Sequence, residues 1–219
     1  TEKIGFTNPS RSGFEGHIIK DIINKLPNLN KKNQSVLDIG CGCGKLCEML
    51  LEHCRQMEND ATLVDSKEML SNISDSEKIT KISGKFPEEV VMTVESYDVI
   101  IVYSVFHYVL GNGCVYSFLD SVISLLKSGG QAIIADIPSA GKRERFFSSD
   151  SGRDFIKKNF QNSSESMVMK SSDNISFDDN ILISLISRAR AMGVDAYIMP
   201  QNKNLFFANR REDLILYKP

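Results

Sequence analysis

Apolar residues recur along the chain with two spacings, and the change between them predicts helices that alternate with strands. From position 14 to position 26 they stand at helical spacing, which predicts an amphipathic helix that ends at Pro27. Short, nearly continuous apolar runs predict strands at 35–39, 61–65, 79–83, 97–103 and 131–137. Between them, helical spacing predicts helices at 46–54, 67–70 and 115–126. Such strands are buried on both faces, so we expect a parallel sheet wrapped by helices.

The alternation of predicted helices and strands is interrupted between residues 138 and 177, where polar and charged residues are frequent and apolar residues are scattered. A long stretch of this kind predicts an insertion or lid rather than core. A helix is predicted from Asp179, with Gly193 as a cap after its end, and two strands follow at 196–199 and 213–217. The loop between these strands is too short for a crossover helix, so we expect them to pair antiparallel. The pattern therefore predicts an α/β protein with a seven-stranded sheet whose last strand is antiparallel.

Composition places the chain among ordinary globular proteins. Its 219 residues are enough for one domain with a full core, and 42% are hydrophobic while 25% are charged. We therefore expect a single domain over 1–219, in which residues 1–34 form an N-terminal helical cap and the 138–177 insertion covers an acceptor site. Neither the composition nor the hydrophobic pattern indicates an oligomeric state.

Charge and cysteine content narrow the expected partners and compartment. A net charge of −2 gives no overall attraction to a polyphosphate backbone, so a nucleic-acid partner is disfavoured. No run reaches the roughly 18 apolar residues that cross a bilayer, and the first residues contain no apolar signal stretch. Five cysteines, an odd number, fit a reducing compartment. We expect a cytoplasmic protein without a membrane partner.

Three glycines stand between the first predicted strand and the helix after it, at Gly40, Gly42 and Gly44. Glycine allows backbone N–H groups to approach a ligand that side chains would block. Asp65 ends the next strand, where a carboxylate can accept hydrogen bonds from both ribose hydroxyls of an adenosine-containing cofactor. A dinucleotide turn has the spacing G-x-G-x-x-G, whereas the third glycine here comes one residue sooner. A purely structural turn and a nicotinamide enzyme remain alternatives.

Several segments resemble the motifs of class I S-adenosylmethionine-dependent methyltransferases. Residues 36–46, Val-Leu-Asp-Ile-Gly-Cys-Gly-Cys-Gly-Lys-Leu, are similar to the first motif, and Asp65 is similar to the ribose-binding acid. Residues 82–86 resemble the adenine-contacting segment, 97–108 the fourth motif, and 125–130 the turn before the fifth strand. The resemblance covers nearly the whole chain. It implies a Rossmann-like fold with helices on both faces, and an enzyme that uses S-adenosylmethionine and releases S-adenosylhomocysteine.

The resemblance also implies which residues contact the cofactor. Asp38 would bind the cofactor's ammonium group, although a carboxylate that only braces the glycine turn is the alternative. Lys85 stands where the family often has an acid, so a side-chain bond to the adenine amino group is not expected, while Phe86 would pack on the ring and donate its N–H. The implied cofactor-binding residues are Asp38, Gly40, Cys41, Gly42, Gly44, Asp65, Ser66, Lys85, Phe86, Tyr103 and Ser104.

Methyl transfer from a sulfonium is an in-line displacement, so the protein mainly has to align the acceptor with the methyl carbon and exclude water. If the acceptor is a hydroxyl, a general base promotes the reaction as the proton leaves. His107 is the first candidate, because it follows the fourth strand at the ligand edge of the sheet. Asp136, which ends the fifth strand, is the second. A packing histidine and a carboxylate that braces a loop are the structural alternatives.

The loop at 200–211 emerges at the same edge and ends in Arg210 and Arg211. Together with Lys203 and the basic run at 142–145, these arginines predict a fork-like binding site for a carboxylate or phosphate group of the acceptor. In the alternative interpretation they form a solvated loop and pair with the acids at 212 and 213. His17 is a further candidate for substrate binding, and aromatic residues expected to line the acceptor site are Phe6, Phe14, Phe146 and Phe147.

Residues 195–201 and 210–216 give a narrower resemblance, to bacterial methyltransferases of surface-polysaccharide or nonulosonic-sugar gene sets. It implies a small-molecule acceptor that is an anionic sugar, with O-methylation as the reaction. Two other functions stay open: an NAD-type oxidoreductase, and a protein that binds S-adenosylmethionine without catalysis. Cys41, Cys43 and Cys47 could supply three thiolates to a metal, but no fourth ligand stands at zinc-site spacing, so no metal is predicted.

Overall fold

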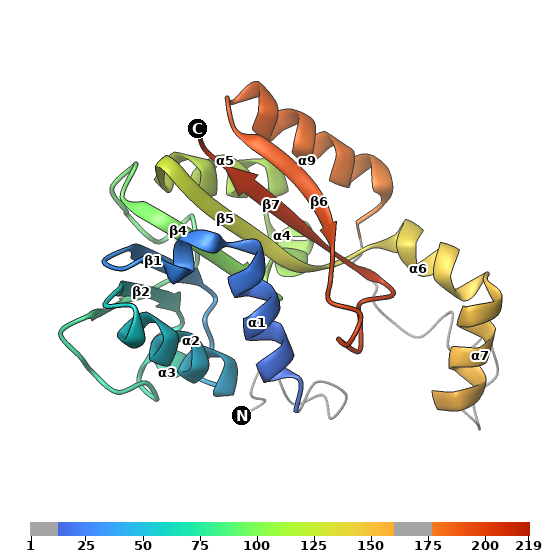
Figure 1. Cartoon of the computed structure of the whole chain (residues 1–219). Helices are drawn as coiled ribbons and strands as arrows, with labels where there is room; N and C mark the ends of the chain where they lie inside the picture. Colours follow the sequence, from blue (N-terminus) through green and yellow to red (C-terminus); the bar gives the residue numbers. More distant parts are fainter. Residues whose placement is uncertain (1–12, 160–176) are drawn as a thin grey trace.

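The structure is a computed structural model that describes residues 13–159 and 177–219. Within these residues, seven strands form one mixed sheet in the order β3-β2-β1-β4-β5-β7-β6 (Figure 1). β7 is antiparallel to both its neighbours, β5 and β6, and the remaining pairs are parallel. The predicted fold class is therefore confirmed. The strands are β1 (Ser35–Ile39), β2 (Asp60–Asp65), β3 (Ile79–Ser83), β4 (Tyr97–Tyr103), β5 (Leu126–Pro138), β6 (Asp195–Pro200) and β7 (Arg211–Tyr217).

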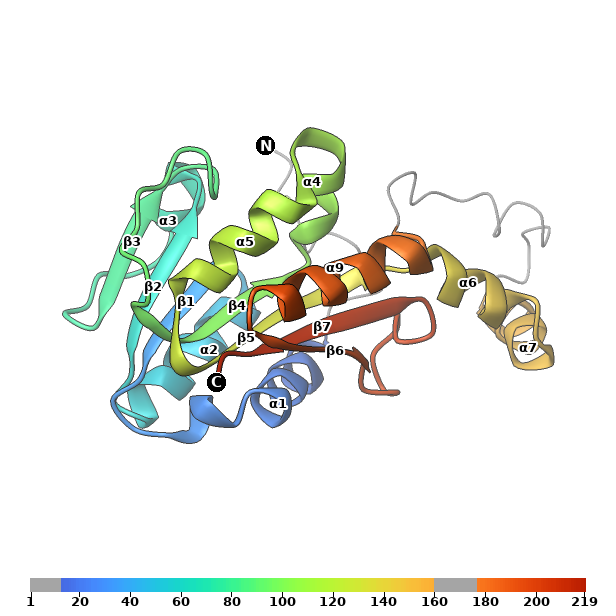
Figure 2. The ribbon, with the colours of Figure 1, turned by 90° about the horizontal axis from the view of Figure 1, so that it is seen from above.

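Helices cover both faces of the sheet. The described helices are α1 (Glu15–Lys25), the short 3-10 helix η1 (Pro27–Asn30), α2 (Lys45–Gln56), α3 (Lys67–Leu70), α4 (Phe106–Asn112), α5 (Val115–Leu125), α6 (Ala140–Phe147), α7 (Asp150–Asn159) and α9 (Asp179–Ala191). α1 and α2 pack on one face, and α5 and α9 on the other (Figures 1 and 2). α6 and α7 lie beyond the end of the sheet (Figure 2).

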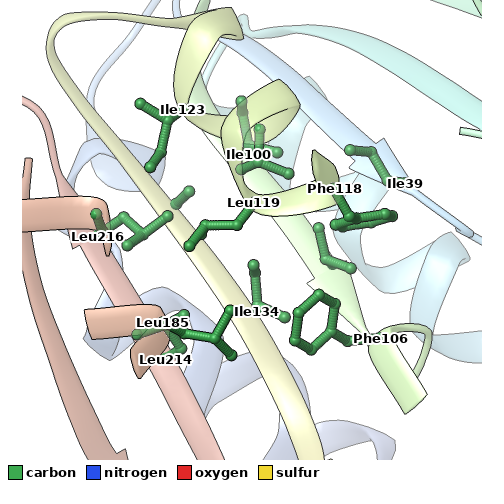
Figure 3. Close-up of a cluster of buried hydrophobic side chains, with 14 of the residues drawn as sticks. Ile39, Ile100, Phe106, Phe118, Leu119, Ile123, Ile134, Leu185, Leu214 and Leu216 are labelled. Atoms are coloured by element: carbon green, nitrogen blue, oxygen red, sulfur yellow. The ribbon is translucent and has the colours of Figure 1, made fainter. Parts of the chain in front are cut away.

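The central strands explain why the core has two layers. In β4, Ile100 and Val102 point into the cluster beneath α5 and α9, while Val99 and Ile101 point into the cluster beneath α1 and α2. Successive side chains of a strand face opposite sides, so a strand with apolar residues at every position is buried on both. Figure 3 shows the first cluster, in which Leu119 and Leu185 from the helices meet Leu214 of β7.

The insertion differs from the expectation in one respect. Phe177, at its end, is completely buried and stacks on Phe106 with ring centroids 5.1 Å apart. The Phe177 N–H donates to the Pro138 carbonyl at 2.8 Å, and the Ala140 N–H donates to the Phe177 carbonyl at the same distance. The two ends of the insertion are thus joined at β5, and its last residue belongs to the core because a phenyl ring fills the space beside Phe106.

The remaining differences are small. β5 begins at Leu126 rather than 131, so most of the predicted turn at 125–130 lies within the strand, next to an irregularity in the pairing of β4 with β5. Phe6 and the expected cover at 1–12 and 160–176 lie outside the described residues. None of the helices that the structure describes is both long enough and apolar enough to cross a membrane.

Candidate active site

The glycine turn between β1 and α2 requires glycine at two of its three positions. Gly40 has φ of 71°, and a Cβ atom there would lie 2.3 Å from Cγ2 of Val105. Gly42 has φ of 60° but open space around it, so only its backbone conformation favours glycine. Gly44 is extended, with φ of −94° and nothing near a Cβ, and any residue adopts that conformation. Gly40 is therefore the position most sensitive to a side chain.

Asp65 at the end of β2 holds this turn in place. Its Oδ2 accepts a hydrogen bond from the Gly42 N–H at 2.8 Å, and its Oδ1 accepts one from the Ser66 N–H at 2.6 Å. Ser66 in turn caps α3, because its Oγ accepts from the Met69 N–H at 3.3 Å. Each carboxylate oxygen can accept a second hydrogen bond. Asp65 thus braces the turn and can still bind a ligand.

Two connected cavities lie along the carboxyl edge of the first strands. One has a volume of about 780 Å³ and the other about 300 Å³, which is the size range of small-molecule sites. They share Gly40, Asp65, Ser66, Val105 and Tyr108 as lining residues. All of the residues predicted to bind the cofactor except Gly44 line one cavity or both. Val105 and Tyr108 belong to the segment at 97–108 that resembles the fourth motif, but they were not among the residues predicted to bind the cofactor.

Asp38 lies in the floor of the smaller of these two cavities. It is buried, and burial raises the pKa of its carboxyl group to about 7, with a smaller contribution from the negative charge of Asp65. Desolvation disfavours the charged form of an acid, whereas a nearby cation restores it. The site therefore offers a carboxylate that becomes more strongly ionised when a cationic group is bound.

The far end of the larger cavity contains Phe86 and Lys85. Phe86 packs edge-on against Phe118, with ring centroids 5.1 Å apart, and its exposed fraction is 9%. The Lys85 N–H donates to Oε2 of Glu89 at 2.8 Å, while its ammonium group lies 3.5 Å from Oε1 of Glu88. Both residues line the cavity, so a flat ring can bind against Phe86 beside a polar rim.

Tyr103 at the end of β4 separates the 300 Å³ cavity from a third, much smaller one. The small cavity has a volume of about 20 Å³, roughly the space of one water molecule. Its polar lining residues are Tyr103, Asp136 and Gln201, and its apolar lining residues are Phe14, Ile18, Leu205, Phe206 and Phe207. We call it the acceptor cavity below. Gln201 was not predicted as a site residue, because in the loop at 200–211 the sequence drew attention to the arginines.

Asp136 is held in the acceptor cavity by a buried polar network. Its backbone has φ of 61°, and its N–H donates to Oδ1 of Asp213 at 2.9 Å. Gln201 donates from Nε2 to Oδ1 of Asp213 at 3.1 Å and to Oδ1 of Asp136 at 3.4 Å. Lys25 donates from Nζ to Oδ2 of Asp213 at 2.6 Å. The second predicted base is thus 2% exposed and contacted from β7 and from the loop after β6, while Lys25 of α1 reaches it through Asp213.

His107, the first predicted base, lies in a different place. It is the second residue of α4, is half-buried, and is not among the residues that line the three cavities. Its ring packs against the ring of Tyr108 at 4.1 Å, and Tyr108 lines both larger cavities. The structure therefore brings Asp136, but not His107, to the walls of the described cavities.

Arg210 and Arg211 both place their guanidinium groups beside the ring of Phe207. The Arg210 guanidinium is 4.4 Å from the centre of the Phe207 ring and also lies within 5.9 Å of the rings of Phe147, Phe155 and Phe206. The Arg211 guanidinium is 5.5 Å from the Phe207 ring, and its Nε is 3.9 Å from Oδ1 of Asp136. The two arginines therefore share Phe207 as a neighbour, and their role in binding an acceptor stays a prediction.

The neighbouring charges pair elsewhere. Glu212 forms an ion pair with Lys142 at 3.1 Å, and Asp213 forms one with Lys25, so both acids have lysine partners. His17 is exposed on α1, whereas Phe14 of the same helical region lines the acceptor cavity. Among residues 13–159 and 177–219, no three acids, cysteines or histidines come together as a metal site.

Comparison with known proteins identifies similar chains. A family model described as a methyltransferase domain matches residues 13–164. The plantazolicin methyltransferase BpumL, solved with a triazolic desmethylPZN analogue and SAH, has 17% identity and a TM-score of 0.63, over 97% of this chain and 86% of that one. No curated protein matches the sequence significantly.

Two further structures are similar over nearly their whole lengths. A chain from the complex of the Haloferax volcanii Trm112 methyltransferase activator with a methyltransferase has 14% identity and a TM-score of 0.62, covering 94% of this chain and 92% of that one. A SAM-dependent methyltransferase from Aquifex aeolicus has 12% identity and a TM-score of 0.60, covering 95% and 93%. At such low identity these similarities establish the fold.

Proposed function

The chain belongs to the methyltransferase domain family and takes its methyl group from S-adenosylmethionine, and from this premise we propose that it methylates a hydroxyl oxygen of a small anionic molecule such as an acidic sugar. One observation carries the proposal. Tyr103 lines both the cavity that contains Asp38 and the glycine turn and the acceptor cavity that contains Asp136. A methyl donor in the first and a hydroxyl in the second would meet at this side chain.

The residues of the two larger cavities fit the cofactor. A side chain at Gly40 would overlap Val105, so glycine there lets the turn pack against the residues after β4 at the edge that both cavities share. Asp65 has lone pairs for the ribose hydroxyls, Asp38 would hold the ammonium group, and Phe86 would hold the adenine. When bound, the cofactor supplies an electrophilic methyl group on a sulfonium.

Asp136 provides the proton acceptor that a hydroxyl substrate requires. As the acceptor oxygen forms its bond to the methyl carbon and the methyl carbon–sulfur bond breaks, a carboxylate oxygen of Asp136 would take the hydroxyl proton, which leaves a methyl ether and S-adenosylhomocysteine as products. Tyr103 and the aromatic wall of the acceptor cavity exclude water and orient the hydroxyl. His107 is kept as the second candidate base, because α4 begins at the same edge of the sheet.

Arg210 supports an anionic acceptor. Its guanidinium is held by the rings of Phe206 and Phe207, which also line the acceptor cavity. An arginine stacked on aromatic rings keeps its charge and its planar donors, and these suit a carboxylate or phosphate. The narrower interpretation, an acidic sugar of a bacterial surface polysaccharide, rests on the sequence resemblance alone.

Calorimetry and a radiolabelled methyl-transfer assay test the proposal. We expect the protein to bind S-adenosylhomocysteine and not NAD, and to label sialic-acid-like sugars or nucleotide sugars in preference to matched neutral sugars and amines. In Asp136→Asn, labelling is expected to fall while binding is retained, and in His107→Ala it is expected to persist. Labelling of amines alone would overturn hydroxyl methylation, and binding without labelling of any acceptor would favour a protein without catalysis.

A further inference from the structure

The pairing of β5 with β7 contains a bulge at Asp136. Ile134 stands opposite Leu214, and Ile137 stands opposite Glu212, so two residues of β5 face the single residue Asp213 of β7. A bulge of this kind leaves a backbone group without its ladder partner and re-aims the side chain beside it. The backbone of Asp136 is left-handed, with φ of 61°, and this conformation accommodates the extra residue of the bulge.

Asp213 supplies the partner that the ladder lacks. Its carboxylate is buried, with 1% of the residue exposed, and its Oδ1 accepts from the Asp136 N–H at 2.9 Å. The same oxygen accepts from Nε2 of Gln201 at 3.1 Å. A buried N–H without an acceptor is costly, so the bulge is stable in this form because Asp213 stands opposite it.

Lys25 connects this point to α1. Its ammonium group lies 2.6 Å from Oδ2 of Asp213 and 2.7 Å from Oδ2 of Asp21, and Lys25 is the last residue of the helix. The helix contributes Ile18 to the acceptor cavity and Ile19 to the 300 Å³ cavity. The carboxylate of Asp213 therefore joins a helix that borders both cavities to the residue proposed as the base.

We propose that Asp213 is a positioning residue for methyl transfer: its carboxylate holds the β5 bulge so that Asp136 faces the acceptor cavity, and its ion pair with Lys25 fixes α1 against the same point. The inference rests on the proposed function, in which Asp136 takes the proton. Asp213 does not line the described cavities and acts through Asp136, Gln201 and Lys25.

Asp98 offers a matched control for Asp213, because it lies at the end of β4 opposite to Tyr103. Its Oδ2 accepts from the Ser35 N–H and from Nζ of Lys127, both at 2.8 Å, so it too combines a backbone hydrogen bond with a lysine ion pair. Replacing either acid by alanine removes the same two kinds of contact. A role in stability alone would lower the melting temperature of both variants and leave the kcat of the folded enzyme similar.

Steady-state kinetics at a temperature where all variants are folded test the proposal. In Asp213→Ala we expect kcat to fall at least about tenfold, because the base is misplaced, with the Kd for S-adenosylhomocysteine within about twofold of the unmodified protein. Asp213→Asn keeps one oxygen that can accept a hydrogen bond, so its kcat should lie between those of the unmodified protein and Asp213→Ala. Asp98→Ala should keep its kcat within about twofold of the unmodified protein. A kcat in Asp213→Ala equal to that of Asp98→Ala would overturn the proposal.

A crystal structure of the unmodified protein with S-adenosylhomocysteine tests the positioning without an acceptor. Asp213 Oδ1 is expected within hydrogen-bond reach of the Asp136 N–H, with the Asp136 carboxylate facing Tyr103. Asp213 turned away from that N–H would overturn the proposal even if the alanine variant does not fold. If no acceptor is methylated, the proposed function fails, and this structure still decides the role of Asp213 in holding the bulge.

Discussion

The hydrogen bonds that hold the glycine turn on the donor side join residues near one another in the sequence, whereas those of the acceptor side join distant parts of the chain. Asp65 and Gly42 are 23 positions apart, within one strand–helix–strand unit. Asp136 and Asp213 are 77 positions apart, and Lys25 and Asp213 are 188 apart. A binding site for a common cofactor can thus be built by a local unit, while the surface that selects the acceptor depends on how the whole chain folds.

The two sides also differ in how open they are. The donor cavities have volumes of about 780 and 300 Å³, and the acceptor cavity has about 20 Å³. An acceptor larger than one water molecule therefore enters only if the lining of the acceptor cavity moves. We infer that the donor side is formed before binding and that the acceptor side opens when the substrate binds.

The largest expected effect separates the two sides at Asp136. Asp136→Asn should lower kcat by about 100-fold or more, because an amide cannot take the proton, while the Kd for S-adenosylhomocysteine stays within about twofold. Kinetics with an identified acceptor and calorimetry give the two values. If the variant loses cofactor affinity as strongly as kcat, the division into two sides is wrong.

A substitution in the glycine turn should act on the donor side alone. Gly40→Ala places a Cβ 2.3 Å from Val105 in a left-handed conformation, so we expect affinity for S-adenosylhomocysteine to fall about 100-fold. Gly44→Ala, where nothing lies within 4 Å, should change it by less than about threefold. Calorimetry measures both, and equal losses at the two positions would contradict the geometry of the turn.

How much of each side was predictable follows from the same difference. The glycine turn, Asp65 and the positions of the strands follow from spacing and hydrophobic runs, which are local signals. Lys25 at the end of an amphipathic helix has the pattern of a solvated lysine, and Gln201 that of a loop residue. Their burial depends on contacts with Asp213, across the sheet, and no pattern within either segment indicates that partner.

The pH dependence of cofactor affinity should report on Asp38. The pKa of its carboxyl group is raised to about 7 mainly by burial, so the acid becomes ionised as the pH rises through that value. A carboxylate attracts the ammonium of S-adenosylhomocysteine, and we expect affinity to increase up to about tenfold between about pH 6 and pH 8. In Asp38→Asn the affinity should be weaker at pH 8 and nearly independent of pH.

The same group should make the stability of the ligand-free protein depend on pH in the opposite direction. The raised pKa means that the folded state binds more protons than the unfolded state between pH 3.8 and about 7. The stability contributed by protonated Asp38, on the order of 4 kcal/mol, is therefore full below this window and lost as the pH rises through it. Thermal melts of Asp38→Asn should show a smaller decline than those of the unmodified protein, and parallel curves would contradict the assignment.

The smallest expected effect concerns Arg210. Arg210→Lys keeps the positive charge but loses the planar contact with Phe206 and Phe207, so we expect stability to fall by about 1 kcal/mol. For an anionic acceptor KM should rise several-fold, about 3 to 10 times, with kcat nearly unchanged. A matched neutral acceptor serves as the control, and an equal rise in its KM would remove Arg210 from acceptor recognition.

A crystal structure with S-adenosylhomocysteine and a bound acceptor tests most directly whether the two sides meet at Tyr103. We predict that the sulfur lies beside Tyr103 and that the acceptor hydroxyl lies between the sulfur and the carboxylate of Asp136. An acceptor bound on the other side of the sulfur, with the Tyr103 ring closing off Asp136, would contradict the account.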